Sequence, residues 1–231
     1  MNTTWIITVF VVIDDLMAAL EHRSHPLAQA SDAEVLTVAV GAAKYFQNHH
    51  ERALYVMQEC GYLSGPLSAS RFNRRLHALG DWLLLVAETL GELFTTGETY
   101  VIDSMPVPVC RRVRAWRCRK VRGRIYCGYC AAKAEKFFWR LHLVCTLAGE
   151  PVRFTLLPAS LHDLTPVHEL ADALPTGATL LGDKAYISAP DAAAMLAESG
   201  VRLVAQVRAN MQPLEWWDDF DLRTHRHTIE T

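Results

Sequence analysis

The fold of this chain is decided by the stretch Thr99-Tyr100-Val101-Ile102-Asp103-Ser104-Met105-Pro106-Val107-Pro108-Val109. Its first four residues have the hydroxylated, aromatic and β-branched side chains that favour a strand. Prolines follow at 106 and 108, and because proline cannot donate a hydrogen bond to a neighbouring strand, we expect the strand to end at Asp103. A second apolar run, Ala178-Thr179-Leu180-Leu181-Gly182, leads to Asp183 in the same way. The sequence therefore predicts two strands that each end on a carboxylate.

Residues 1–97, before this stretch, carry apolar side chains at helical spacing. Ser31-Asp32-Ala33-Glu34 has the pattern of a capping box, in which the serine and the glutamate side chains each satisfy a backbone amide at the start of a helix. Gly61 and Gly80 mark the ends of two later helices. We therefore expect a helical domain over residues 1–97.

A basic helix within this domain suggests contact with DNA. A Gly-Pro turn follows the helix that ends at Gly61, and the first turns of the next helix carry Arg71, Arg74 and Arg75. This order is compatible with a helix-turn-helix motif, whose second helix lies in the major groove. A helical bundle with a solvated basic face is the alternative.

Beyond Gly97 the pattern changes from helical to extended. Strands are predicted over 136–147, 151–157, 179–181 and 201–207, with one helix after Thr165 and another over 189–198. With the first strand, the order is β-β-β-α-β-α-β, followed by a last helix. We therefore predict an α+β or α/β chain in which residues 98–231 form a second domain with an RNase H-like mixed sheet and right-handed crossovers.

This arrangement brings the two aspartates together. In an RNase H-like sheet the first strand is central, and the strand that leads to Asp183 lies parallel beside it, about 4.8 Å away. Asp103 and Asp183 would then share one edge of the sheet and bridge a divalent cation. Carboxylates suit Mg²⁺ or Mn²⁺, and two such ions can activate a nucleophile and stabilise a leaving oxygen in phosphodiester chemistry. The alternative is that each aspartate caps a loop.

The net charge of −2 conceals a local basic segment. Eight basic residues and no acidic residue lie between positions 111 and 124: Arg111, Arg112, Arg114, Arg117, Arg119, Lys120, Arg122 and Arg124. Because like charges repel unless a polyanion is near, this segment favours phosphate binding over a solvated loop. Interleaved aromatic residues suit stacking on unpaired bases.

The cysteines and the apolar start favour a cytoplasmic protein. Six cysteines without a secretory leader are expected to stay reduced. Cys127 and Cys130 have the spacing of half a zinc site, but Cys110 and Cys118 do not form a matching pair, so zinc is not expected. The apolar run over residues 5–13 is too short to span a membrane.

Four segments occur in a fixed order: Val101-Ile102-Asp103-Ser104-Met105-Pro106, Ser160-Leu161-His162-Asp163, Leu181-Gly182-Asp183-Lys184-Ala185-Tyr186 and Arg226-His227-Thr228-Ile229-Glu230-Thr231. In these segments the chain resembles the DDE transposases of bacterial insertion sequences. The resemblance implies an RNase H-like domain with two Mg²⁺ or Mn²⁺ ions. It also implies cleavage of DNA at terminal inverted repeats and transfer of the free 3′-hydroxyl into target DNA. A homo-oligomer on DNA in the bacterial cytoplasm or nucleoid, with no membrane partner, would be the working form.

By this resemblance, the catalytic and metal-binding carboxylates are Asp103, Asp183 and Glu230. Arg226 fits the family spacing before Glu230, and with Lys184 it would contact phosphate. Arg223 stands where the family has tyrosine, and the lysine that the family has seven residues after its glutamate would fall beyond Thr231. We therefore expect an incomplete last helix, a domain truncated just after its third carboxylate, and impaired activity.

Two other functions remain open. A non-catalytic DNA-binding fragment could compete with the full-length transposase or regulate it. A nuclease with the RNase H fold would instead act on any duplex, without specificity for terminal repeats.

Overall fold

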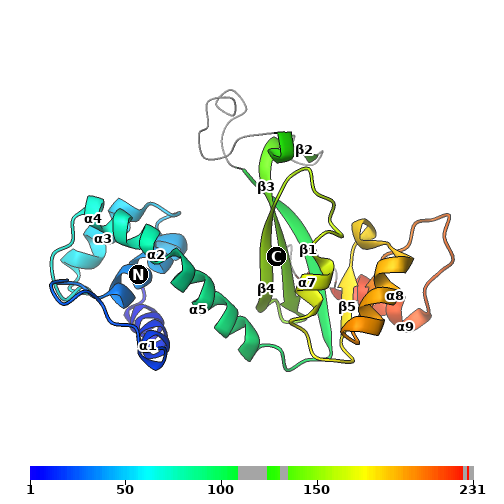
Figure 1. The fold of residues 1–231 in the computed structure, drawn as a ribbon, viewed down its shortest axis with the longest axis horizontal. Helices are drawn as coiled ribbons and strands as arrows, with labels where there is room; N and C mark the ends of the chain where they lie inside the picture. The colour runs from blue at the N-terminus through cyan, green and yellow to red at the C-terminus, as the bar shows by residue number, and fades with distance from the viewer. Residues whose placement is uncertain (109–123, 131–134, 226–227, 229–231) are drawn as a thin grey trace. The chain divides into compact units, whose positions relative to one another are not determined.

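The computed structural model describes residues 1–108, 124–130, 135–225 and 228. It divides into two compact units, Met1–Ala87 and Glu88–Thr231, which are considered separately (Figure 1). The division falls within helix α5 (Gly80–Leu93), earlier than residue 97, where the change from a helical to an extended pattern suggested the boundary. Glu88 on α5 forms an ion pair with Arg153 of the second unit, so the last turns of the helix belong to that unit.

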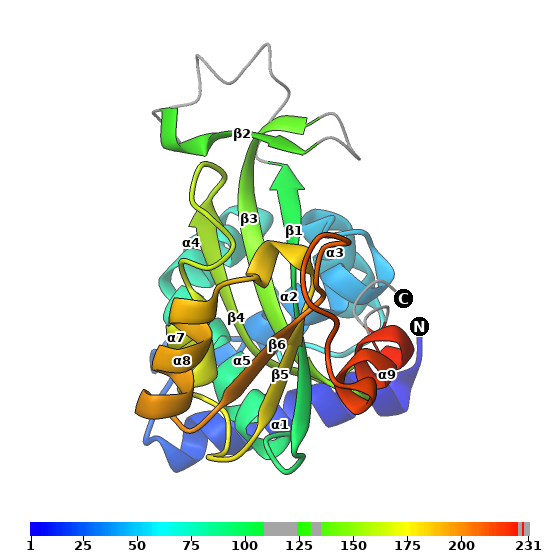
Figure 2. The same cartoon turned by 90° about the vertical axis from the view of Figure 1, so that its right-hand side faces the viewer.

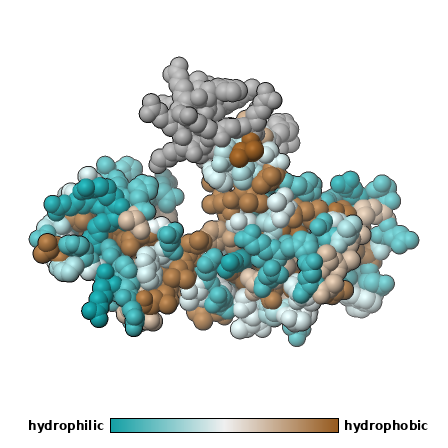
Figure 3. Space-filling model, in the orientation of Figure 1, coloured by the Kyte–Doolittle hydropathy of each residue, from teal (hydrophilic) through white to brown (hydrophobic). Residues whose placement is uncertain are grey.

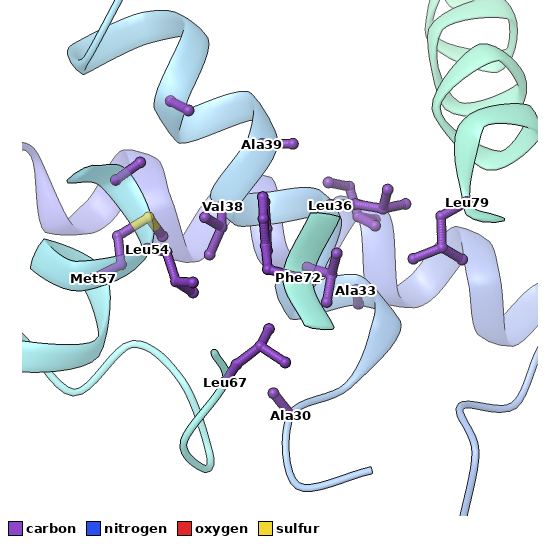
Figure 4. Packing of buried hydrophobic residues seen from close by; sticks show 14 of the residues in the cluster. Ala30, Ala33, Leu36, Val38, Ala39, Leu54, Met57, Leu67, Phe72 and Leu79 are labelled. Atoms are coloured by element: carbon purple, nitrogen blue, oxygen red, sulfur yellow. The ribbon is translucent and has the colours of Figure 1, made fainter. Parts of the chain in front are cut away.

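The first unit is helical, as expected from its periodicity. Its helices are α1 (Thr3–Ala19), α2 (Asp32–Tyr45), α3 (His50–Glu59), α4 (Ala69–Ala78) and the start of α5. Helix α2 contacts α1, α3 and α4, and Val35, Leu36 and Val38 are fully buried on it. Figure 4 shows that Phe72 points from α4 into this cluster, so α2 forms the centre of the helical core.

Glu34 ties the core of the first unit to the segment that joins α3 to α4. The predicted capping box is confirmed, because Ser31 Oγ accepts from the Glu34 amide and the Glu34 carboxylate accepts from the Ser31 amide. The same carboxylate accepts from the Ser64 amide at 2.5 Å and from the Ser64 hydroxyl at 2.8 Å. Glu34 is only 7% exposed, so one buried carboxylate satisfies donors from two segments.

Arg75, one of the three arginines proposed to contact DNA, is bound within the first unit. Its guanidinium contacts Asp32 through Nη2 at 2.5 Å and through Nε at 3.1 Å, and it donates to the Ala30 carbonyl at 2.8 Å. Arg71 and Arg74 are exposed. Residues 60–68 separate α3 from α4, a longer connection than the three- to four-residue turn of a helix-turn-helix.

The second unit contains a mixed sheet. Its strands are β1 (Thr99–Pro108), β2 (Cys127–Cys130), β3 (Glu135–Thr146), β4 (Pro151–Pro158), β5 (Thr179–Gly182) and β6 (Arg202–Ala205). Strand β1 pairs antiparallel with β3 and parallel with β5, while β4 pairs with β3 and β6 with β5 (Figure 2). The expectation that β1 is central and that β5 is its parallel neighbour is confirmed. Strand β2, which pairs with the start of β3, was not predicted.

Helices cover the two faces of the sheet differently. Helices α7 (Val167–Ala171) and α8 (Ala189–Glu198) pack with Tyr100, Ile102 and Leu180 in the larger of the two apolar cores of the second unit. Helix α9 (Trp216–His225) packs through Leu222 on Leu181 and Val204. Because successive side chains of a strand point to opposite faces, these two groups of helices lie on opposite sides of the sheet.

The prediction that the first strand ends at Asp103 is wrong. Strand β1 continues to Pro108 and stays in register with β3, pairing Pro106 with Arg140 and Pro108 with Phe138. Strand β5 pairs with β1 only as far as Ile102, so the other edge of β1 is uncovered beyond that point. The two prolines are two residues apart, so both nitrogens face the same edge of the strand. They are tolerated because this is the edge that β5 no longer covers.

Some apolar side chains remain at the surface. Leu84 and Leu93 on α5 are 45% and 67% exposed, and Figure 3 shows patches of apolar surface between hydrophilic ones on the face that it displays. None of the helices in the described part of the chain has the length and apolar character needed to cross a membrane.

Replacing Glu34 with alanine is expected to destabilise the first unit by about 2–4 kcal/mol, because the amides of Ser31 and Ser64 lose their charged acceptor. Hydrogen exchange of the full chain, read peptide by peptide, would measure this as lost protection in α2 to α4. Glu59→Ala, at an exposed carboxylate at the end of α3, is the control and should leave protection unchanged. Equal protection in the two variants would contradict the role of Glu34.

Candidate functional site

Asp103 and Asp183 lie side by side at the end of the β1–β5 ladder. The last pair of this ladder joins Ile102 to Gly182, and each aspartate is the next residue in its chain. Asp103 is half-buried and Asp183 is exposed. The sequence prediction that parallel pairing brings these two carboxylates to one place on the sheet is therefore consistent with the observed register.

The two aspartates line one small cavity. It has a volume of about 60 Å³, and its wall is formed by the ends of β1 and β5 and by Leu222 of α9. Oxygen donors around a space of this size suit a hard divalent cation, which prefers carboxylates and water as ligands. Within the described ranges, no group of three or more His, Cys, Asp or Glu side chains could hold a metal ion. Asp103 and Asp183 therefore fit part of a metal site and leave room for a further ligand.

The turn after β5 fixes the position of Asp183. The Asp183 side chain accepts a hydrogen bond from the Ala185 amide at 2.8 Å and caps the short 3-10 helix η3 (Lys184–Tyr186). Tyr186 is fully buried in the larger core. A Cβ atom on Gly182 would lie 3.0 Å from two atoms of Tyr186. Glycine is therefore needed at this position so that the tyrosine can pack beneath the strand end.

Tyr186 contacts His142 of β3 through its hydroxyl group. The Tyr186 hydroxyl lies 3.3 Å from His142 Nδ1, and both side chains are fully buried. Burial lowers the pKa of His142 to about 4, with Asp163 opposing this shift and Arg140 adding to it. Burial also raises the pKa of Tyr186, and the negative charges of Asp163, Asp103 and Asp183 raise it further. Both groups are therefore neutral at pH 7.

A second polar group lies next to Asp103. The Ser104 amide donates to Asp103 Oδ1 at 2.7 Å, and the Ser104 hydroxyl donates to Asp163 Oδ1 at 2.6 Å. Arg140 Nη1 donates to both oxygens of Asp163, at 2.8 and 3.1 Å. The sequence placed Asp163 only in a segment that carries the family resemblance, and it did not single out Arg140 or His142. Their positions on alternate residues of β3 were the available signal, but the partner strand had to be known before it could be used.

Helix α9 lies beside the two aspartates and ends before the residues expected to form the incomplete last helix. It packs through Leu222, which also lines the cavity. The described helix ends at His225, and Thr228 lies in a turn. Arg226 and Glu230, which the resemblance assigns to phosphate and metal, lie outside the described residues.

Most of the predicted DNA-binding segment also lies outside the described residues, namely Arg111, Arg112, Arg114, Arg117, Arg119, Lys120 and Arg122. Arg124 begins the 3-10 helix η1 (Arg124–Tyr126), and Lys184 is exposed beside Asp183. Cys127 is an exposed free thiol, while Cys110 and Cys118 lie outside the described residues. Of the basic residues predicted to bind DNA, the structure brings Lys184 to the aspartate pair.

Gly182→Ala is expected to destabilise the second unit by about 1–3 kcal/mol, because the added methyl group must displace the buried Tyr186 ring. Urea unfolding followed by tryptophan fluorescence would measure the change. Gly97→Ala is the control, since its Cβ would lie 3.9 Å from its nearest neighbour, an ordinary contact. A Gly182 variant as stable as the control would show that the tyrosine does not depend on this glycine.

The second unit is expected to lose up to about 3 kcal/mol of stability as the pH falls from about 6.5 to about 4 because of His142 alone. The pKa of His142 in the folded chain, about 4, lies below the ordinary histidine pKa of about 6.5, so the unfolded chain binds the proton more readily in this window. Urea unfolding at pH 7 and pH 4.5 would show that the free energy of unfolding changes less with pH in His142→Gln than in the natural chain. The same pH effect in both would contradict a buried neutral histidine.

Comparison with known proteins agrees with this geometry. Residues 94–231 match the family model described as the transposase DDE domain. No curated protein and no solved structure matches the chain. The match spans both aspartates, the turn that holds Asp183 and the polar group around Asp163. It also covers more than half of the sequence, so this chain belongs to the transposase DDE domain family.

Proposed function

We propose that the chain is a DNA transposase of a bacterial insertion sequence, which cuts DNA at the ends of the element and joins the free 3′-hydroxyl to target DNA. The observation that carries the proposal is the placement of Asp103 and Asp183 on adjacent parallel strands around one cavity, within a region that matches the transposase DDE domain. Family membership alone indicates transposition chemistry in general. The carboxylate pair supports metal-dependent chemistry on a phosphodiester.

The strand order supports an RNase H-like fold for the second unit. Across the sheet the strands follow the order β4, β3, β1, β5 and β6. Strand β1 is parallel to β5 on one side and antiparallel to β3 on the other. This is the mixed sheet expected from a hairpin meander followed by crossovers. This strand order explains why the two aspartates are neighbours, because each one follows the last residue of the ladder between the central strand β1 and its parallel neighbour β5.

Asp103 and Asp183, with Glu230 as the third carboxylate, would hold two Mg²⁺ or Mn²⁺ ions. Such ions, when bound, activate the attacking oxygen and stabilise the leaving oxygen of the phosphodiester. The chain's own part is to fix the carboxylates. The Ser104 amide holds Asp103, and the Ala185 amide holds Asp183. Lys184 is exposed next to Asp183, and its charge would contact a DNA phosphate there.

The basic residues are proposed to bind DNA in two regions. Arg71 and Arg74 line a pocket of the first unit together with Arg75, whose charge is already paired with Asp32. The segment from Arg111 to Arg124 is the second region. It carries eight of the 23 lysines and arginines of the chain and no acidic residue, so its affinity for DNA should fall steeply with salt.

Asp103→Asn and Asp183→Asn are each expected to lower the rate of cleavage at terminal repeats by about 10³-fold or more, because each removes a metal-binding charge worth about 4 kcal/mol to the transition state. Cleavage of a labelled duplex that carries the inverted repeats flanking the gene, with Mg²⁺ or Mn²⁺, would measure this. DNA affinity measured without metal should be unchanged in both variants.

Asp172→Asn, at an exposed carboxylate of the same unit, is the matched control and should cleave at the natural rate. Equal cleavage of a duplex without the repeats would favour the RNase H-fold nuclease instead. Specific binding without any cleavage by the natural chain would favour the non-catalytic DNA-binding fragment. Unchanged rates in the two aspartate variants would contradict the assignment of the site.

A further inference from the structure

We propose that Asp163 is a positioning residue that fixes the Asp103 carboxylate through Ser104. Asp163 itself does not line the cavity between the two aspartates. The inference rests on the proposed function, because it gives the Asp103 carboxylate the task of binding a divalent cation.

The connection between the two aspartates runs through one residue. The Ser104 side chain and the Asp103 side chain point to opposite faces of β1, because they are neighbours in a strand. On one face, the Ser104 hydroxyl donates to Asp163 at 2.6 Å. On the other, the Ser104 amide donates to Asp103 at 2.7 Å. Ser104 therefore transmits the position of Asp163 through the sheet to the candidate metal ligand.

The Ser104 amide is available for this task because of the sheet register. Ser104, Pro106 and Pro108 alternate along β1, so their nitrogens face the same edge. Strand β5 covers that edge only as far as Ile102. The Ser104 amide therefore faces the edge of β1 that carries β5, two residues beyond the last pair of the β1–β5 ladder.

Asp163 is itself held by Arg140. The guanidinium donates to both carboxylate oxygens and lies 3.4 Å from the Ser104 hydroxyl. The side chains of Arg140 and Asp163 are 21% and 15% exposed, so water weakens this pair less than it would at the surface. Arg140 also compensates the charge of Asp163. The pair thus anchors Ser104 without adding net charge near the site.

The contacts of Asp163 do not fit a helix-capping role. The helix that follows, α7, has Pro166 at its N-cap and no side-chain hydrogen bond to its first amides. Asp163 instead accepts hydrogen bonds from Ser104 on β1 and Arg140 on β3. Asp163 thus binds Ser104, the residue that follows Asp103 on β1, and this contact is suited to orienting the Asp103 carboxylate.

Titration of the metal-free full chain with Mn²⁺, followed by calorimetry or electron paramagnetic resonance, would test the proposal. Ser104→Ala and Asp163→Asn are each expected to weaken Mn²⁺ binding by about 10- to 100-fold, the usual effect of losing a residue that orients a metal ligand. The double variant should be little worse than either single one, because both changes break the same connection. Ser104→Thr keeps the hydroxyl and should restore binding. In cleavage assays, kcat should fall while KM for DNA stays the same.

Val201→Ala is the control for a purely structural effect. Val201 is fully buried in the same core, but it precedes β6 at the end of the sheet where Thr179 pairs with Arg202, opposite to the aspartates. This variant should lose stability and keep the natural Mn²⁺ affinity.

Mn²⁺ affinities of Ser104→Ala and Asp163→Asn within about twofold of the natural chain would overturn the proposal, as would an equal loss in Val201→Ala. A natural chain that binds no Mn²⁺ would also overturn it. A natural chain that binds Mn²⁺ and cleaves no DNA would refute the proposed function alone, since the difference in Mn²⁺ affinity would still decide the role of Asp163.

Discussion

Four residue pairs between β1 and β5, from Thr99 with Thr179 to Ile102 with Gly182, hold the candidate site together. The next residue of each strand is an aspartate, and because the strands are parallel and in register, the two aspartates lie at the same end of the ladder. A shift of one residue in this register would send one carboxylate to the opposite face of the sheet. The fully buried side chains of Tyr100 and Leu180 oppose such a shift, since it would expose them.

Support for the two aspartates comes from the face of the sheet that they do not occupy. Tyr186 and His142 are fully buried there, and the Tyr186 hydroxyl lies 3.3 Å from the histidine ring. Asp163, Arg140 and Ser104 form the second connection on this face. Helix α9 covers the other face through Leu222 and closes the cavity. The site is therefore enclosed by apolar packing on one side and held by polar contacts on the other.

Much of the secondary structure could be predicted from residue types and spacing. The helices of the first unit, the capping box of Ser31 and Glu34, and the alternation of strands and helices after Gly97 all follow from local patterns that the tertiary structure reinforces. The end of β1 could not be predicted, because proline is excluded from a paired edge and accepted at an uncovered one. Whether Pro106 faces one or the other depends on where β5 stops, far away in the sequence.

The sequence by itself determined the chemistry available to this protein: two carboxylates, each after a short apolar strand, a dense basic segment, and the Gly182 to Tyr186 turn that carries the family resemblance. It could do so because strand ends, turns and charge runs are properties of neighbouring residues. Only the tertiary structure decided the partners of each group. It paired Arg75 with Asp32, and Asp163 with Ser104 and Arg140. These contacts join residues that are distant in sequence, and burial and strand register, rather than local pattern, select among the many partners that a charged side chain could take.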